Sequence, residues 1–135
     1  MGFLFQGKAW KLEKIGDVGV LNFDLEGERV NKFSKDSLPE LEQVIKEIAT
    51  GKFGFKSLLI RSLKKQSFIV GADISMIQKI ADKTQAFEAS RFGQEVFSKV
   101  EDLKIPTLAA IEGPCMGGGT ELALSCKHRI CSDLD

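Results

Sequence analysis

The sequence predicts an α/β fold in which short buried strands alternate with helices. Apolar runs suited to buried strands occur at residues 57–62 and 108–111. Between them lie apolar residues at helical spacing, and a glycine-rich segment after the second run opens another helix. This alternation is typical of a parallel sheet, because each helix carries the chain back along the sheet. The 135 residues suffice for one domain at most, with a real core.

A β-hairpin is expected near the N-terminus. Residues 10–15 and 18–23 alternate apolar and polar side chains, which is the period of a strand with one buried face. Gly16 and Asp17 lie between the two runs and predict a turn.

The first helix is expected to begin at Ser37. Ser37 and Glu40 have the S-x-x-E spacing of a capping box, Pro39 stands in the first turn, and Gly51 ends the element. Its apolar residues recur at helical spacing and predict an amphipathic helix that covers a sheet: Leu38, Leu41, Val44, Ile45 and Ile48.

Two more helices are expected before the second apolar run. A short one begins near Asp73, and a longer one runs from about Thr84 to Leu103. Ile105-Pro106 ends the longer helix, because proline disfavours helical geometry in the residue before it. The apolar face of that helix is predicted from its spacing as Phe87, Phe92, Val96, Val100 and Leu103.

The last elements follow the strand at 108–111. Gly113-Pro114 predicts a turn, residues 118–127 a helix, and Arg129 the start of another strand. The chain ends at Asp135 just as this strand begins, so we expect residues 1–135 to be part of a larger domain.

Composition argues against several classes of protein. Nineteen basic and nineteen acidic residues cancel, and no basic stripe suggests nucleic-acid binding. No apolar run is long enough to span a membrane, and the N-terminus lacks the pattern of a signal peptide, so we expect a cytoplasmic protein. Three cysteines without CxxC spacing predict neither disulfides nor a metal site, and we expect them to be reduced and buried: Cys115, Cys126 and Cys131.

The most informative segment is Gly117-Gly118-Gly119-Thr120-Glu121. Glycines between a buried strand and a helix leave main-chain N–H groups that a ligand oxygen can approach, and a helix N-terminus favours negative charge. A carboxylate, Glu121, follows on the first turn. This combination suits enolate chemistry on a carbonyl compound. The alternative stays open that the glycines only pack a helix tightly and that Glu121 only complements the helix dipole.

A second segment, residues 67–74, has the same order of strand, glycine turn and helix start. The N–H of Ala72 follows the turn at Gly71, so Ala72 and Gly118 are candidates for the two donors of an oxyanion hole. Asp73 by itself is better explained as a helix cap than as a catalytic group.

Together these segments resemble the crotonase (enoyl-CoA hydratase/isomerase) superfamily. The sequence FIVGADI at residues 68–74, followed by IEGPCMGGGTE at 111–121, carries the resemblance. Residues 68–74 and the stretch Val30–Ser34 are particularly similar to the hydratase part of multifunctional fatty-acid β-oxidation α-subunits. The resemblance implies a spiral of ββα units, of which residues 1–135 would form the N-terminal part.

The resemblance also implies roles for individual residues. The N–H groups of Ala72 and Gly118 would hold the thioester carbonyl oxygen of an acyl-CoA. Glu121 would be the first of two catalytic glutamates that add water to a trans-2-enoyl-CoA, and the second would lie beyond Asp135. The neighbouring residues would contact substrate: Gly71, Asp73, Ile74, Gly117 and Gly119.

No cofactor is implied besides acyl-CoA as substrate, and NAD would belong only to a dehydrogenase region that follows in the multifunctional subunits. The expected partners are further copies of the chain or a thiolase-type subunit. Three alternatives stay open: a catalytically incomplete fragment that binds acyl-CoA or oligomerises, an enoyl-CoA isomerase, and a nucleotide-binding α/β domain. A Ser-His-Asp hydrolase is disfavoured, because His128 is the only histidine and no G-x-S-x-G turn occurs.

Overall fold

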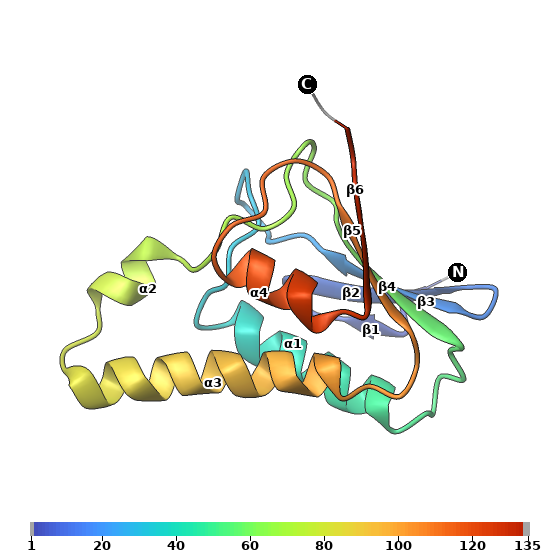
Figure 1. Ribbon diagram of the computed structural model, residues 1–135, viewed down its shortest axis with the longest axis horizontal. Coiled ribbons are helices and arrows are strands. Elements are labelled where there is room, and N and C mark those ends of the chain that lie inside the picture. Colours follow the sequence, from blue (N-terminus) through green and yellow to red (C-terminus); the bar gives the residue numbers. More distant parts are fainter. Residues whose placement is uncertain (1, 134–135) are drawn as a thin grey trace.

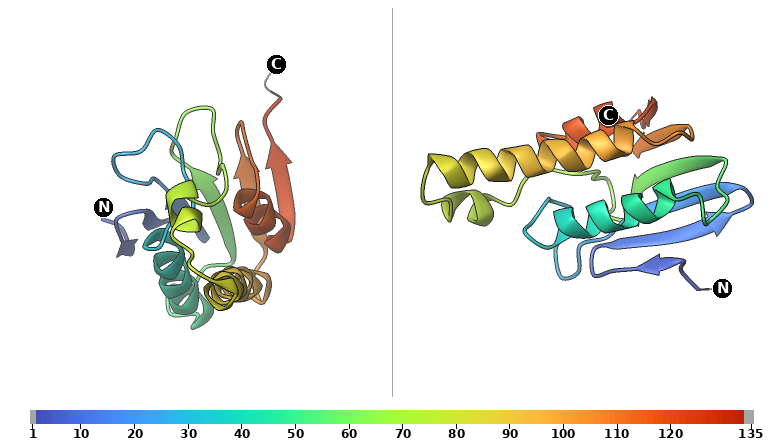
Figure 2. Two further views of the ribbon diagram at one scale, coloured as in Figure 1. Left: turned by 90° about the vertical axis from the view of Figure 1, so that its left-hand side faces the viewer. Right: turned by 90° about the horizontal axis from the view of Figure 1, so that it is seen from below.

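The computed structural model describes residues 2–133, which form a six-stranded sheet and four helices. The helices lie together on one side of the twisted sheet (Figures 1 and 2). The strands are β1 (Phe5–Gln6), β2 (Trp10–Ile15), β3 (Val18–Phe23), β4 (Ser57–Ser62), β5 (Thr107–Ile111) and β6 (His128–Cys131). The helices are α1 (Ser37–Ala49), α2 (Ile74–Gln78), α3 (Lys83–Glu101) and α4 (Gly118–Ser125).

The strands follow one another across the sheet in chain order. β1, β2 and β3 pair antiparallel, whereas β3, β4, β5 and β6 pair parallel. At least one helix connects each parallel pair, which is the arrangement that parallel strands require. The predicted α/β class and the predicted hairpin, with Ile15 opposite Val18, are confirmed. β1 was missed because two residues are too few to show a period.

A chain of aromatic rings runs through the core from the sheet to α3. Trp10 stacks on Phe23 with ring centroids 4.0 Å apart, and Phe23 stacks on Phe33 at 5.7 Å. Phe33 meets Phe97 of α3 edge to face at 5.3 Å. All four rings are buried, so Phe33, although a loop residue, is anchored in the core.

The start of α1 differs from the predicted capping box. Ser37 does not pair with Glu40, and the reciprocal bonds run one turn earlier. The N–H of Ser34 donates to Oγ of Ser37 at 2.8 Å, and the N–H of Ser37 donates to Oγ of Ser34 at 3.0 Å. The predicted apolar face of α1 is confirmed, because all five of its residues are buried.

Glu40 instead binds the strand β2 and the residues before it. Its carboxylate accepts main-chain N–H groups from Lys8 at 2.7 Å, Ala9 at 2.8 Å and Trp10 at 2.6 Å. A Cβ built on Gly7 would collide with the Glu40 carboxyl group, so any other residue there would displace the carboxylate from these N–H groups. The capping box was wrong because these N–H groups, about thirty residues upstream, compete for the carboxylate.

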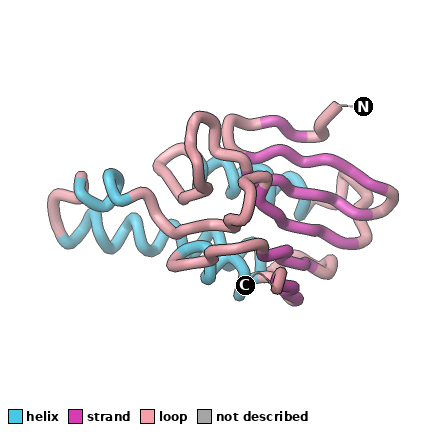
Figure 3. Tube along the Cα trace, turned by 90° about the horizontal axis from the view of Figure 1, so that it is seen from above, coloured by secondary structure: helices cyan, strands magenta, loops and turns pink. Residues whose placement is uncertain are grey.

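Helix α2 and the first half of α3 form an arm, here called the α2–α3 arm, that extends beyond the sheet (Figures 1 and 3). Ile74 is 69% exposed and Phe87 is 64% exposed, so the prediction that Phe87 faces the core is wrong. The helical period was read correctly, but the first half of α3 has no sheet beside it. Phe92 is half-buried against the core, and Val96, Val100 and Leu103 are buried as predicted. No helix within residues 2–133 has the length and apolarity needed to cross a membrane.

Helix α4 ends two residues earlier than expected. Cys126 is already extended, with φ −77° and ψ 148°, because the chain turns there into β6. The N–H of Lys127 donates to Oγ1 of Thr107 at 2.8 Å and joins this turn to the start of β5.

Replacing Glu40 with alanine is expected to destabilise the fold. The change removes a charged acceptor from three main-chain N–H groups, and the expected loss in free energy of unfolding is about 2–4 kcal/mol. Urea denaturation of the two proteins measures it. As a control, Glu47→Ala removes only an exposed ion pair with Lys52 and should cost no more than about 0.5 kcal/mol. Equal losses in the two variants would contradict this role of Glu40.

Candidate functional site

The glycine turn at residues 69–72 lies between two other stretches of chain. On one side Ile69 pairs with Cys115, and its carbonyl accepts the N–H of Met116 at 2.9 Å. On the other side the N–H of Val70 donates to the carbonyl of Asn31 at 2.9 Å. Residues from three separate loops therefore form a small parallel ladder beyond the ends of the main strands.

The turns at Gly71 and Gly117 touch, main chain against main chain. A Cβ built on Gly71 would lie 3.5 Å from the Met116 carbonyl oxygen and 4.0 Å from the nitrogen of Gly118. A Cβ built on Gly117 would lie 3.5 Å from Cα of Gly71. Both glycines have positive φ, +110° and +52°, which other residues rarely adopt. The two predicted donor segments are therefore neighbours in space.

The N–H groups of Ala72 and Gly118 are left unpaired. Phe33 donates to the carbonyl of Gly71 at 2.8 Å and accepts the N–H of Asp73 at 2.8 Å, so the N–H of Ala72 points to the opposite side. Gly118 is the first residue of α4, where an N–H has no partner within the helix. Within residues 2–133 neither group donates a hydrogen bond.

The other two glycines of the triplet are required by packing. A Cβ on Gly119 would lie 2.4 Å from the Ile69 carbonyl oxygen, and one on Gly118 would lie 2.9 Å from the ring of Phe33. Tight packing of α4 was the alternative explanation of these glycines. The two explanations are compatible. Glycines that let α4 pack closely on Ile69 and Phe33 also leave the N–H of Gly118 open to a ligand.

Glu121 lies on the first turn of α4 and is exposed. Its N–H donates to the carbonyl of Gly117 at 3.1 Å, which holds Glu121 on the helical turn next to the glycine turn. Across the described residues its carboxylate makes no hydrogen bond or ion pair. The carboxylate is thus available to a ligand.

Asp73 is engaged as a helix cap, as expected. Its Oδ1 accepts the hydroxyl of Ser75 at 2.8 Å and the N–H of Ser75 at 2.9 Å, and these bonds lower the pKa of the Asp73 carboxyl. Nζ of Lys32 lies 3.9 Å from Oδ2. Ile74, which was predicted to contact substrate, projects from the arm and is largely exposed.

Asn31 supports the site and was missed as a functional candidate. Its amide donates to the carbonyl of Phe23 at 2.8 Å and to Oγ of Ser62 at 2.8 Å, and its Oδ1 accepts the N–H of Leu25. The side chain is completely buried. Asn31 therefore ties the ends of β3 and β4 to Val70. Its signal in the sequence was its place in the stretch Val30–Ser34, which carries part of the family resemblance.

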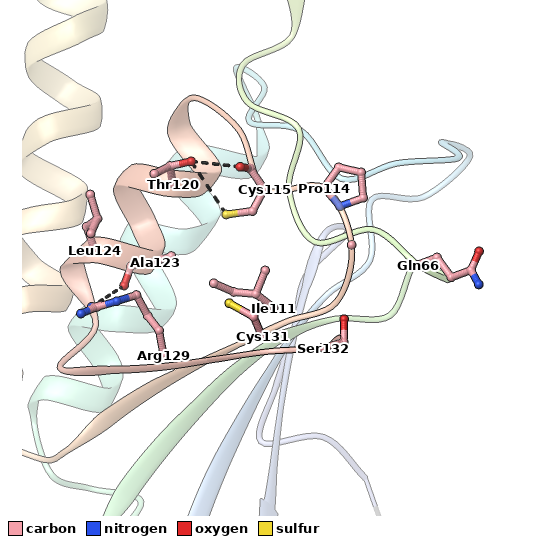
Figure 4. Close-up of a pocket in the computed structure, with 11 residues that line it drawn as sticks. Gln66, Ile111, Pro114, Cys115, Thr120, Ala123, Leu124, Arg129, Cys131 and Ser132 are labelled. Carbon is pink, nitrogen blue, oxygen red and sulfur yellow. Dashed lines mark hydrogen bonds between the residues drawn. The ribbon is translucent and has the colours of Figure 1, made fainter. Parts of the chain in front are cut away.

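A cavity lies between α4 and β6 (Figure 4). It holds about 710 Å³ and includes Cys115, Thr120 and Arg129 in its lining, but not Ala72, Gly118 or Glu121. The Arg129 guanidinium points at the end of α4 and donates to the carbonyls of Ala123 and Cys126. This cavity is therefore separate from the unpaired N–H groups.

The remaining titratable residues considered for a functional role do not join the site. His128 is an exposed residue of β6. Nζ of Lys64 pairs with Asp24 at 2.7 Å and donates to the carbonyl of Leu25 at 2.8 Å. Residues 2–133 contain no group of histidine, cysteine and carboxylate side chains that could hold a metal ion.

The cysteines only partly follow expectation. Cys126 is buried and Cys115 half-buried, but Cys131 is exposed because β6 is the edge strand. Burial raises the pKa of the Cys126 thiol to about 11 and also raises the pKa of the Cys115 thiol. Neither has the lowered pKa of a nucleophile.

The sequence model of the enoyl-CoA hydratase/isomerase family matches residues 16–134. Two similar curated proteins are both named fatty acid oxidation complex subunit alpha. The one from Shewanella loihica is 42% identical over 127 residues, which are 93% of this chain and 18% of that protein. The one from Aliivibrio fischeri is 42% identical over 113 residues, which are 84% and 16%. The chain spans less than a fifth of the length of these relatives.

Solved structures show the same fold. DspI of Pseudomonas aeruginosa aligns with a TM-score of 0.83 and 30% identity over 95% of this chain and 47% of that one. An enoyl-CoA hydratase from Geobacillus kaustophilus aligns with a TM-score of 0.86 and 22% identity over 94% and 47%. The predicted crotonase-like spiral, in its N-terminal part, is confirmed as the fold.

Replacing Gly119 with alanine is expected to destabilise the protein by about 2 kcal/mol, because the new Cβ forces α4 away from Ile69. Gly93 within α3 is the matched control. A Cβ there meets only the Leu38 side chain at 3.9 Å, so Gly93→Ala should stabilise by roughly 0.5–1 kcal/mol. Thermal unfolding measures both, and a gain in stability from Gly119→Ala would contradict the packing described.

The thiols are expected to react in order of exposure. Near pH 8, a thiol reagent should label Cys131 first and Cys115 slowly, and should reach Cys126 only when the protein unfolds. Mass spectrometry of timed samples measures the order, and urea-unfolded protein is the control. Labelling of Cys126 as fast as Cys131 in the folded protein would show the burial to be wrong.

Proposed function

The chain belongs to the enoyl-CoA hydratase/isomerase family, and we propose on that basis that it supplies the thioester-binding half of an enoyl-CoA hydratase of fatty-acid β-oxidation. The reaction is the reversible addition of water across the double bond of a trans-2-enoyl-CoA. The relatives' name, fatty acid oxidation complex subunit alpha, supports this substrate class.

The contact between the turns at Gly71 and Gly117 is the observation that carries the proposal. As water adds to the double bond, negative charge develops on the thioester oxygen. Two main-chain N–H groups on adjoining turns, those of Ala72 and Gly118, are the donors that such an oxygen needs. Their glycine surroundings supply no Cβ that would keep the oxygen away.

The N-terminus of α4 adds to this stabilisation. Gly118 is its first residue, so the partial positive charge of the helix end points to the same oxygen. The donors are held by other hydrogen bonds and do not have to reorganise when charge develops. Charge on the oxygen is therefore favoured more in the transition state than in the bound substrate.

Glu121 acts as the acid/base on water. It follows the donor Gly118 by three residues on one helical turn, so its carboxylate lies near the place where the thioester is held. As a carboxylate it accepts a proton from the attacking water. The family resemblance implies a second glutamate for the proton at the α-carbon. An exposed carboxylate at this position favours a hydratase over those isomerases that lack one.

Substrate contacts of Gly71, Asp73, Ile74, Gly117 and Gly119 belong to the same proposal. A cytoplasmic location, a homo-oligomeric state and a thiolase-type partner stay predictions.

Replacing Glu121 with glutamine in the complete gene product tests the proposal. Glutamine keeps the size of the side chain but cannot accept the proton, so the rate of crotonyl-CoA hydration should fall about a hundredfold or more. Loss of absorbance of the conjugated thioester measures the rate. Binding of a saturated acyl-CoA, measured by calorimetry, should stay nearly unchanged.

Glu101→Gln is the matched control, since Glu101 is an exposed glutamate at the far end of α3 and should give wild-type rates. Hydration by Glu121→Gln at the wild-type rate would remove Glu121 from the reaction. Absence of hydration in the wild-type protein would overturn the proposed function itself.

A further inference from the structure

We propose that Phe33 is the positioning residue that sets the distance between the two N–H donors, a role that rests on the proposed function. Phe33 is the one described residue whose main chain holds the Ala72 segment and whose ring also supports Gly118. It lies in the loop between β3 and α1, far in sequence from both.

The main chain of Phe33 fixes Ala72 from both sides. Its N–H donates to the carbonyl of Gly71 at 2.8 Å, and its carbonyl accepts the N–H of Asp73 at 2.8 Å. Ala72 is paired with Phe33 as in a parallel ladder. The direction of the Ala72 N–H is therefore set by the position of Phe33.

The ring of Phe33 fixes the start of α4. A Cβ on Gly118 would lie 2.9 Å from Cδ2 of Phe33, so the ring lies directly against Cα of Gly118. The ring is itself held between Phe23 and Phe97, and Phe33 is only 3% exposed. Helix α4 can approach Ala72 only as far as this ring allows.

One rigid residue therefore serves as the spacer between the two donors. Catalysis by preorganised donors is sensitive to their separation, because displacement by about 1 Å can cost about a hundredfold in rate. Phe33 has no polar side-chain atom to offer a substrate. Its effect must pass through Ala72 and Gly118.

The experiment compares phenylalanine truncations at two positions in the complete gene product. Phe33→Leu and Phe33→Ala shorten the spacer. Phe55→Leu and Phe55→Ala are the matched controls. Phe55 is buried like Phe33, but its ring packs on Gly19 at the opposite end of β3. Truncation at either position should lower stability by a similar amount.

Two readouts distinguish positioning from stability. The first is crotonyl-CoA hydration, with kcat and KM determined separately below the unfolding temperature. The second is the infrared carbonyl stretch of bound, isotope-labelled butanoyl-CoA, a saturated thioester that cannot be hydrated. Hydrogen bonds from both donors lower this frequency in the wild-type protein.

For Phe33→Ala we expect kcat to fall about tenfold or more with KM changed less than about threefold, and the carbonyl frequency to move back toward its value in water. Phe33→Leu should show both effects in smaller measure, and it decides the question alone if Phe33→Ala does not fold. The Phe55 variants should keep the wild-type kcat and carbonyl frequency.

Equal kcat and carbonyl frequency in the Phe33 and Phe55 variants would overturn the positioning role while leaving the proposed function intact. An inactive wild-type protein, or one in which bound butanoyl-CoA shows no lowered carbonyl frequency, would instead count against the proposed function.

Discussion

The candidate site depends on one contact, that of the Gly71 turn against the Gly117 turn. Each turn bends the chain through a positive φ, and the atoms that meet are main-chain atoms. A residue other than glycine at either position would strain the backbone, because both turns need a positive φ. Because the turns belong to segments about forty-five residues apart, their contact has to be maintained by everything packed around it.

The surrounding structure holds each turn in a separate way. The side chain of Asn31 forms hydrogen bonds at the ends of β3 and β4, and its main-chain carbonyl accepts the N–H of Val70. Asn31 therefore ties the first turn to these two strands. Gly119 lets α4 approach the carbonyl of Ile69, which ties the second turn to the first. Phe33 belongs to the aromatic core and touches both. The site is thus built on the sheet and the core, whereas the α2–α3 arm extends past them.

Periodicity in the sequence was sufficient for most elements. The bounds of β2, β3 and β4 agree with the predicted runs, because alternation and continuous apolarity are local properties. Periodicity failed where a contact depends on residues far away in the sequence. The carboxylate of Glu40 binds N–H groups at residues 8–10 instead of capping its own helix, and Phe87 obeys the helical period with no sheet beside it. For the site, each glycine segment could be read as a donor of N–H groups from its own residues. Their shared order of strand, glycine turn and helix start suggested that they serve one oxyanion hole, and the family resemblance supported this. The loop pairing that holds them together left no local signal in the sequence.

The most direct measurement is a crystal structure of the complete gene product with a bound saturated acyl-CoA. We expect the thioester oxygen to lie about 3 Å from both the nitrogen of Ala72 and the nitrogen of Gly118, with the Glu121 carboxylate on the side of the β-carbon. A thioester bound with its oxygen on only one of these nitrogens, or elsewhere on the protein, would contradict this expectation.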